Sequence, residues 1–129
     1  MSQSHAALGM PRLDLVVLDC PDPRALGAFY AKVLGWSIVS ADDDWVDLRG
    51  PGGGIGLSFQ RVEGYQPPTW PEGPRPQHFH LDLQVPDIDA AEPAVLEAGA
   101  TVHEHQPSEN GGFRVYLDPA GHPFCLCRD

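Results

Sequence analysis

Basic residues are scarce in this sequence. Eight lysines and arginines stand against eighteen aspartates and glutamates, and the formal net charge is -10. A protein that binds nucleic acid needs a basic surface to neutralise phosphates, so the composition argues against such a partner. The same charge disfavours an anionic membrane surface. No apolar run is long enough to cross a bilayer, and Met1–Met10 lacks the basic and apolar segments of a signal peptide. We therefore expect neither nucleic acid nor a membrane as a partner.

Cysteine is also rare, and the three residues present are an odd number: Cys20, Cys125 and Cys127. Cys125 and Cys127 lie two positions apart on a predicted strand, so they point the same way and are badly placed to pair with each other. Reduced thiols favour a cytoplasmic location. A chain of 129 residues can bury a working core without disulfides or a structural metal.

One apolar stripe at helical spacing dominates the first half of the chain. It occupies the positions i, i+3, i+4, i+7 and i+8, namely Leu26, Phe29, Tyr30, Val33 and Leu34. Asp22 can cap the amino end of this helix, and Pro23 fits its first position. Gly35 follows the stripe, at the position where helices commonly end with a residue in the left-handed conformation. The pattern predicts a helix between Asp22 and Gly35.

The same arrangement returns in the second half. Asp87 can cap a helix whose apolar stripe is followed by Gly99, and the stripe consists of Ile88, Ala91, Val95 and Leu96. The two capping aspartates lie 65 residues apart, and Gly35 and Gly99 lie 64 apart. A spacing of half the chain indicates an internal duplication. Pro93 lies inside the second stripe and is expected to kink or delay that helix.

Each predicted helix follows one strand candidate and precedes three short ones, which turn residues separate. The first four are expected at Leu13–Asp19, Trp36–Ser40, Trp45–Arg49 and Ile55–Gln60. The second four are expected at His78–Val85, Thr101–Glu104, Phe113–Leu117 and Phe124–Cys127. This order predicts an α+β fold of tandem βαβββ modules at 13–61 and 78–129, after a frayed segment at 1–12.

The segment 62–77 between the modules is too rich in proline for a helix or a central strand. It contains Tyr65 and Trp70. Two interpretations stay open, a connector whose aromatic side chains pack on the rim of the sheet and a lid over a pocket.

Three phrases of the sequence resemble a known family. They are Asp22-Pro23 through Phe29-Tyr30 to Val33-Leu34-Gly35-Trp36, then His80-Leu81-Asp82-Leu83 before Pro86-Asp87, and Asp118-Pro119-Ala120-Gly121-His122-Pro123-Phe124. Together with the repeat, they resemble the vicinal oxygen chelate superfamily of glyoxalases, extradiol dioxygenases and bleomycin-resistance proteins. The resemblance implies that the modules form an open cupped sheet around a pocket. It also implies a homodimer with ligands in clefts made at the dimer.

Alternation along the strands assigns side chains to faces. In the second module His78, His80, Asp82 and Gln84 form a polar face, which is expected to look into the cup. Phe79, Leu81, Leu83 and Val85 form an apolar face, which is expected to lie against the helix. In the first module, the corresponding cup residues are the apolar Leu15 and Val17. The cup should therefore be polar in one half and apolar in the other.

Metal enzymes that this chain resembles use ligands from the first and last strands of each module. In this sequence, the ligand positions of those enzymes correspond to Leu15, to Gly56 (or Ser58 or Gln60), to His80 and to Cys125. Leu15 and Gly56 cannot ligate through side chains, so the complete metal site is not expected. If a metal is present, His80 and Cys125 are its ligands, and histidine with thiolate suits zinc.

The resemblance and the face assignment give one expected pocket: Leu15, Val17, Trp45, Gln60, His78, His80, Asp82, Arg114, Tyr116 and Cys125. Arg114 and Tyr116 share one strand face, which points either into the cup or into water. His80 is the candidate acid or base, because its side chain titrates near neutral pH. The expected function is a small-molecule site without metal. The alternative is a metal-dependent lyase, isomerase or dioxygenase.

Overall fold

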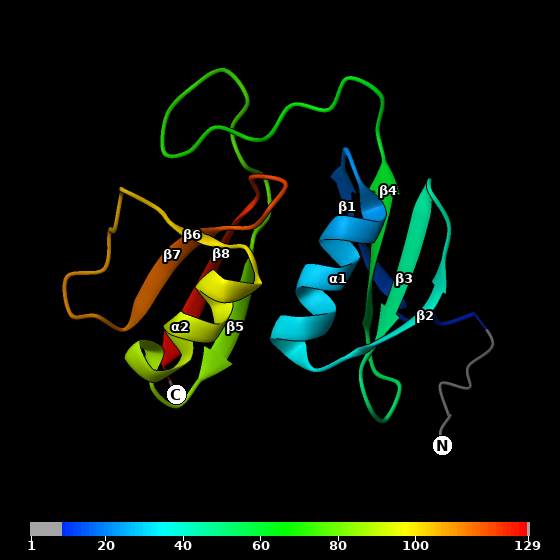
Figure 1. Cartoon of the computed structure of the whole chain (residues 1–129), viewed down its shortest axis with the longest axis horizontal. Coiled ribbons are helices and arrows are strands. Elements are labelled where there is room, and N and C mark those ends of the chain that lie inside the picture. Colours follow the sequence, from blue (N-terminus) through cyan, green and yellow to red (C-terminus); the bar gives the residue numbers. More distant parts are fainter. Residues whose placement is uncertain (1–8, 129) are drawn as a thin grey trace.

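The computed structural model describes residues 9–128 (Figure 1). Most of the segment expected to be frayed, 1–12, lies outside these described residues. The first half contains β1 (Leu15–Cys20), α1 (Pro23–Leu34), β2 (Ser37–Ala41), β3 (Trp45–Arg49) and β4 (Gly56–Arg61). The second half contains β5 (Leu81–Val85), α2 (Ile88–Ala98), β6 (Thr101–Val102), β7 (Phe113–Leu117) and β8 (Pro123–Arg128). None of the described helices is long and apolar enough to span a membrane.

The strands form two four-stranded sheets with the same order. The first is β1-β4-β3-β2 and the second is β5-β8-β7-β6. In each sheet the first and last strands of the module pair in parallel, and the other neighbours pair antiparallel. This repeat confirms the predicted α+β fold of tandem βαβββ modules. No ladder joins the two sheets among the described residues, so the cupped sheet consists of two separate halves.

The predicted caps define both helices. The Asp22 carboxylate accepts a hydrogen bond from the Ala25 amide at 3.2 Å, and Gly35 ends α1 in the left-handed region with φ 69°. The Asp87 carboxylate accepts the equivalent bond from Ala90, also at 3.2 Å. Pro93 does not delay α2, because the helix begins directly after its cap, at Ile88.

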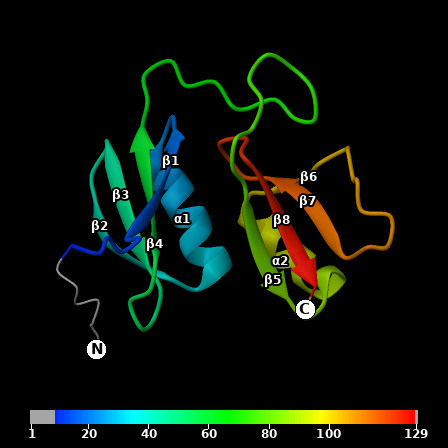
Figure 2. The ribbon, with the colours of Figure 1, turned by 180° about the vertical axis from the view of Figure 1, so that it is seen from behind.

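Aromatic side chains of α1 join the two sheets. The Tyr30 ring stacks on Phe59 of β4 and meets Phe124 of β8 edge to face. The Tyr30 hydroxyl donates to the buried carboxylate of Asp118 at 2.7 Å. Burying one aromatic side chain stabilises the fold by roughly 1.5–3 kcal/mol. Figures 1 and 2 show α1 between the two sheets, so the sheet faces opposite the helices point outward.

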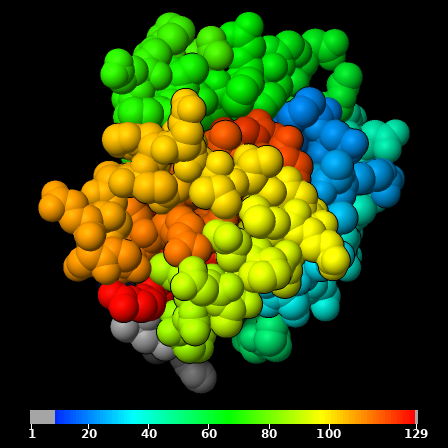
Figure 3. Space-filling model, turned by 60° about the vertical axis from the view of Figure 1, so that its left-hand side comes forward, coloured from blue at the N-terminus to red at the C-terminus, as the bar shows by residue number. Residues whose placement is uncertain are grey.

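The connector between β4 and β5 crosses from one module to the other without forming a regular strand. Its one β-bridge among the described residues joins Thr69 and Pro76. The Trp70 ring contacts the rings of His103 and His105 at centroid distances of 5.1 and 5.2 Å. Figure 3 shows the connector, in green, lying against the turn that precedes β8. The connector therefore packs on the second module, as one of the two interpretations requires.

Candidate functional site

Three predicted residues come together on the outward face of the second sheet. The His80 Nε2 atom lies 3.1 Å from Asp82 Oδ1, and Asp82 is directly opposite Cys125 in the parallel pair of β5 and β8. The possible ligand atoms of these residues all lie within 4.8 Å of one another. Leu81, Leu83 and Val85 pack against the core on the other face, as alternation predicts. Phe79 does not, because it precedes the start of β5 and is 90% exposed.

The thiols beside Asp82 are held in the protonated form. Burial raises the pKa of Cys125 to about 12, and the Asp82 carboxylate contributes in the same direction. Burial and Asp82 also raise the pKa of Cys127. A nucleophilic cysteine needs a lowered pKa, so neither thiol is suited to covalent catalysis.

A cleft of about 420 Å³ opens between the edge of β1 and the segment that leads into β5. Val17, His78 and His80 line it, so three of the predicted pocket residues share this space. Its walls are mainly apolar, with contributions from Leu18 and Tyr30. A concave, largely apolar site with a few polar groups has the general character of a small-molecule site.

The connector forms the roof of this cleft through Tyr65, Arg75 and Gln77. The Tyr65 hydroxyl donates to the Ala120 carbonyl at 3.0 Å, and burial raises its pKa. His122 Nε2 approaches the Asp19 carbonyl to 2.6 Å, which requires a hydrogen on that nitrogen. The connector is thus both packed on the rim and placed over a cleft, so the two interpretations of the sequence are not exclusive.

Several polar residues of the cleft were not predicted from the sequence, among them Tyr65, Arg75, Gln77 and His122. The buried Oε1 atom of Gln77 has no hydrogen-bond partner among the described residues. A buried acceptor without a partner is costly, so a donor from a bound molecule or water would be stabilising there. His122 belongs to the motif before the last strand of the second module, which resembles the known family. Its place in that motif was the one feature of the sequence that could have pointed to His122 as a cleft residue.

Trp45, Gln60 and Leu15 do not line the cleft. Trp45 pairs with Gln60 across β3 and β4, and its indole Nε1 donates to Asp47 at 2.6 Å. Asp47 also accepts bonds from Ser40 and Ser58. These donors, with Ser58 the strongest, lower the pKa of the Asp47 carboxylate. The first sheet therefore carries a separate, internally satisfied polar cluster.

The metal positions implied by the resemblance do not assemble into a complete ligand set. Leu15 lies directly opposite Gly56 in the pair of β1 and β4, and neither offers a donor atom. The Ser58 hydroxyl already binds Asp47. The first module therefore supplies at most the Gln60 amide, the third alternative, which lies opposite Asp19, and a four-ligand site shared by both modules does not fit this chain.

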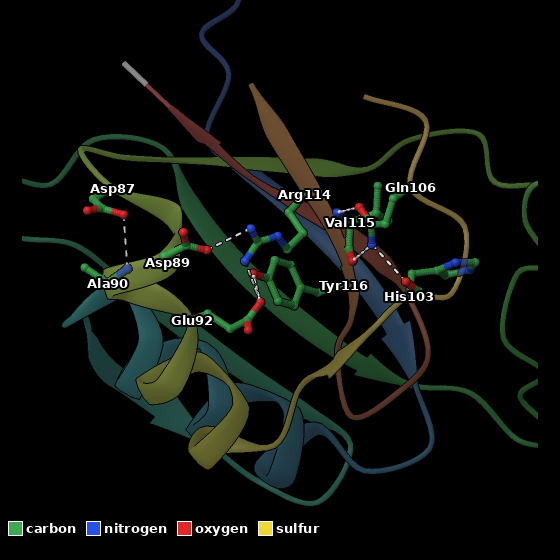
Figure 4. Close-up of polar contacts among 9 residues, drawn as sticks. All are labelled: Asp87, Asp89, Ala90, Glu92, His103, Gln106, Arg114, Val115 and Tyr116. Carbon is green, nitrogen blue, oxygen red and sulfur yellow. Dashed lines mark hydrogen bonds and ion pairs between the residues drawn. The ribbon is translucent and has the colours of Figure 1, made fainter. Parts of the chain in front are cut away.

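The expectation that Arg114 and Tyr116 face the pocket is wrong (Figure 4). The Arg114 guanidinium pairs with Asp89 and with Glu92 of α2, each at 2.9 Å. The Tyr116 hydroxyl donates to Glu92 at 2.7 Å. These two donors, Tyr116 first, lower the pKa of Glu92. The side chains point to α2 because its carboxylates satisfy them there, and the spacing of Asp89 and Glu92 on the helix was the sign available in the sequence.

Comparison with known proteins gives one family match and many structural neighbours. The model of a glyoxalase-like domain matches residues 15–127. No curated protein sequence matches the chain. A glyoxalase/bleomycin resistance protein/dioxygenase family enzyme from Burkholderia phytofirmans PsJN superimposes with a TM-score of 0.68 at 21% identity, over 92% of this chain and 98% of that one.

Two further neighbours have the same fold. A possible glyoxalase from Bacillus cereus superimposes with a TM-score of 0.67 at 17% identity, over 90% of this chain and 97% of that one. A bleomycin-binding protein from Streptomyces verticillus, solved with copper(II)-bleomycin, gives a TM-score of 0.58 at 19% identity, over 93% of this chain and 98% of that one. At these identities the neighbours establish the architecture of this chain and not its ligand.

Proposed function

This chain belongs to the glyoxalase-like domain family of the vicinal oxygen chelate superfamily, and we propose that it binds a small organic molecule in the cleft beneath the connector. The observation that carries the proposal is the cleft itself, about 420 Å³ in volume. Sites for small ligands fall in a range of roughly 300–1,000 Å³. The bleomycin-binding neighbour supports a binding role in this family.

The lining of the cleft favours a ligand with an apolar body and a polar end. Val17, Leu18 and Tyr30 contribute apolar surface to the lining, and Arg75 and His78 contribute hydrogen-bond donors to it. Arg75 uses its Nε to bind the Pro67 carbonyl at 2.9 Å, which fixes the guanidinium over the cleft. Because a guanidinium pairs well with carboxylate, we expect a ligand that carries an acceptor or an anionic group.

A second copy of the chain is proposed to cover the cleft. Val17 and Phe79 line the cleft and are 41% and 90% exposed. Large exposed apolar side chains at an open sheet edge mark a surface that another molecule covers. A homodimer would bury them and close the ligand site. The three free thiols favour a reducing compartment, so a cytoplasmic location is part of the proposal.

An enzyme is the second candidate. The Asp82 carboxylate lies 3.1 Å from His80 Nε2 and could orient the imidazole as an acid or base. A metal-dependent lyase, isomerase or dioxygenase is less well supported, because Leu15 and Gly56 offer no ligands. Turnover that disappears in His80→Ala while folding is retained would favour the enzyme.

The binding proposal is tested by thermal-shift screening of a broad panel of small organic acids and amphipathic molecules, followed by calorimetry. A ligand at a hundred times its Kd stabilises the folded protein by about 2.7 kcal/mol. Val17→Trp fills the cleft and should abolish binding. Val39→Trp is the matched control, because Val39 is 60% exposed on β2 and does not line the cleft. A panel without any stabilising compound, or equal binding by both variants, would oppose the proposal.

A further inference from the structure

We propose that His122 is the hydrogen-bond acceptor of the cleft, and that the cleft takes an organic acid that also carries a hydroxyl or N–H group. The proposal rests on the proposed function, because it names the ligand class of that same cleft. His122 lies directly before β8 and lines the cleft. Arg75 lines it as well and can bind an anionic group of the ligand. His122 adds a contact that only a molecule with a donor hydrogen can use.

The turn before β8 holds the backbone of His122 in place. The Asp118 carboxylate accepts hydrogen bonds from the amides of Ala120 and His122 at 2.9 and 3.0 Å. The Asp118 amide donates in return to the His122 carbonyl at 3.0 Å. Asp118 is 4% exposed, so water does not compete for these bonds. The imidazole of His122 therefore extends from a fixed position.

Two neighbours fix the hydrogen of this imidazole on Nε2. The Asp19 carbonyl lies 2.6 Å from Nε2, and a carbonyl oxygen can only accept. The Tyr65 hydroxyl lies 3.2 Å from the same nitrogen. It donates its own hydrogen to the Ala120 carbonyl at 3.0 Å, so it too accepts from Nε2. In the neutral imidazole, Nδ1 then carries a lone pair and no hydrogen.

The lone pair of Nδ1 is available to a ligand. Within residues 9–128, Nδ1 of the half-buried His122 forms no hydrogen bond, and Gln77 Oε1 is the one buried side-chain polar atom without a partner. It follows that Nδ1 is accessible and not enclosed. An acceptor on a ring that is already fixed gains a hydrogen bond without the cost of ordering its side chain, so it favours ligands with an O–H or N–H.

Matched pairs of organic acids test this ligand class. We compare para-hydroxyphenylacetate with para-methoxyphenylacetate, and mandelate with its O-methyl ether, because the members of each pair differ in the donor hydrogen. Binding is followed by NMR and calorimetry at about pH 8, where histidine side chains are ordinarily neutral. The hydroxyl-bearing member of at least one pair should bind about three- to tenfold more tightly, which is the factor that one hydrogen bond contributes. With isotope-labelled histidine, Nδ1 of His122 should resonate as a hydrogen-free nitrogen in the free protein.

His122→Gln separates the roles of the two ring nitrogens. A glutamine amide can still donate to the Asp19 carbonyl from about the place of Nε2, but it puts no acceptor at the place of Nδ1. The variant should keep a Tm close to that of the wild type and bind both members of each pair equally. His105→Gln is the matched control, because His105 is exposed and does not line the cleft. This control should keep the preference for the hydroxyl.

The outcomes separate this proposal from the proposed function. Equal binding of both members by the wild type, a preference that survives in His122→Gln, or a hydrogen bonded to Nδ1 in the free protein would each overturn the role of His122. The cleft would stand in those cases as long as Val17→Trp abolishes binding. Failure of these acids and of the whole thermal-shift panel to bind would overturn both proposals together.

Discussion

Tyr30→Phe tests whether the two modules are joined through the helix layer. The substitution keeps the ring contacts with Phe59 and Phe124 and removes only the hydroxyl that donates to Asp118. Asp118 is 4% exposed and keeps its bonds from the Ala120 and His122 amides. One buried carboxylate oxygen loses its donor, which costs about 1–3 kcal/mol. For a chain of this size, that loss lowers the Tm by several degrees.

The loss should depend on pH. Burial raises the pKa of Asp118, so the protonated form is favoured in the folded state. Because its pKa is raised, Asp118 stabilises the fold at acid pH, where it is protonated. This contribution is lost as the pH rises through the pKa of Asp118 in the folded protein. The ionised carboxylate needs the Tyr30 donor more than the neutral acid does. Tyr30→Phe should therefore cost more at about pH 7 than at about pH 4.

The assay is urea unfolding of both proteins at the two pH values, with free energies taken from linear extrapolation. A smaller difference at acid pH supports the contact. Equal stability of both proteins at neutral pH would refute the reasoning, since it would mean that Asp118 does not bind Tyr30 between the modules.

Three further predictions concern other parts of the molecule. Glu92→Gln should remove a carboxylate whose pKa is lowered by Tyr116 and Arg114. The free energy of unfolding of the wild type should therefore fall more steeply than that of the variant as the pH drops through the pKa of Glu92 in the folded protein. Parallel curves of unfolding free energy against pH would contradict this. Phe79→Asp should shift gel-filtration elution from dimer to monomer while the Tm of the fold barely changes, because the residue is 90% exposed; a wild-type monomer at micromolar concentration would end the dimer proposal. Gly27→Leu should destabilise strongly, because its Cβ would lie 2.7 Å from a Val46 methyl group in the core; thermal unfolding at the wild-type Tm would be the opposing result.

Local rules in the sequence were sufficient for the repeated elements. Capping aspartates, terminal glycines and apolar stripes located both helices, and strand alternation placed His80 with Asp82. These features depend on residues that are close in sequence or on strand alternation. They are therefore readable without knowledge of the packing. Cys125 was placed beside His80 and Asp82 only through the family resemblance.

The relative placement of distant parts was not readable. Arg114 and Val115 point to opposite faces of β7, and alternation alone does not say which of the two faces packs against α2. The ion pairs of Arg114 with the carboxylates of α2 show that the face of Arg114 does. The cleft arises because Tyr65 of the connector binds Ala120, fifty-five residues away in the sequence. Likewise, Trp45 and Gln60 were expected to line the pocket with Val17, yet the packing of the modules leaves them outside the cleft.

Chemical-shift mapping by NMR tests the central claim most directly. A compound that stabilises the protein in the thermal-shift panel is titrated into labelled protein, and backbone amide shifts are followed. The account predicts the largest changes at Val17, Gln77 and His78, with little change at Asp47 or Arg114. Changes centred on Asp47 or Arg114, with Val17, Gln77 and His78 unaffected, would contradict the assignment of the cleft as the binding site.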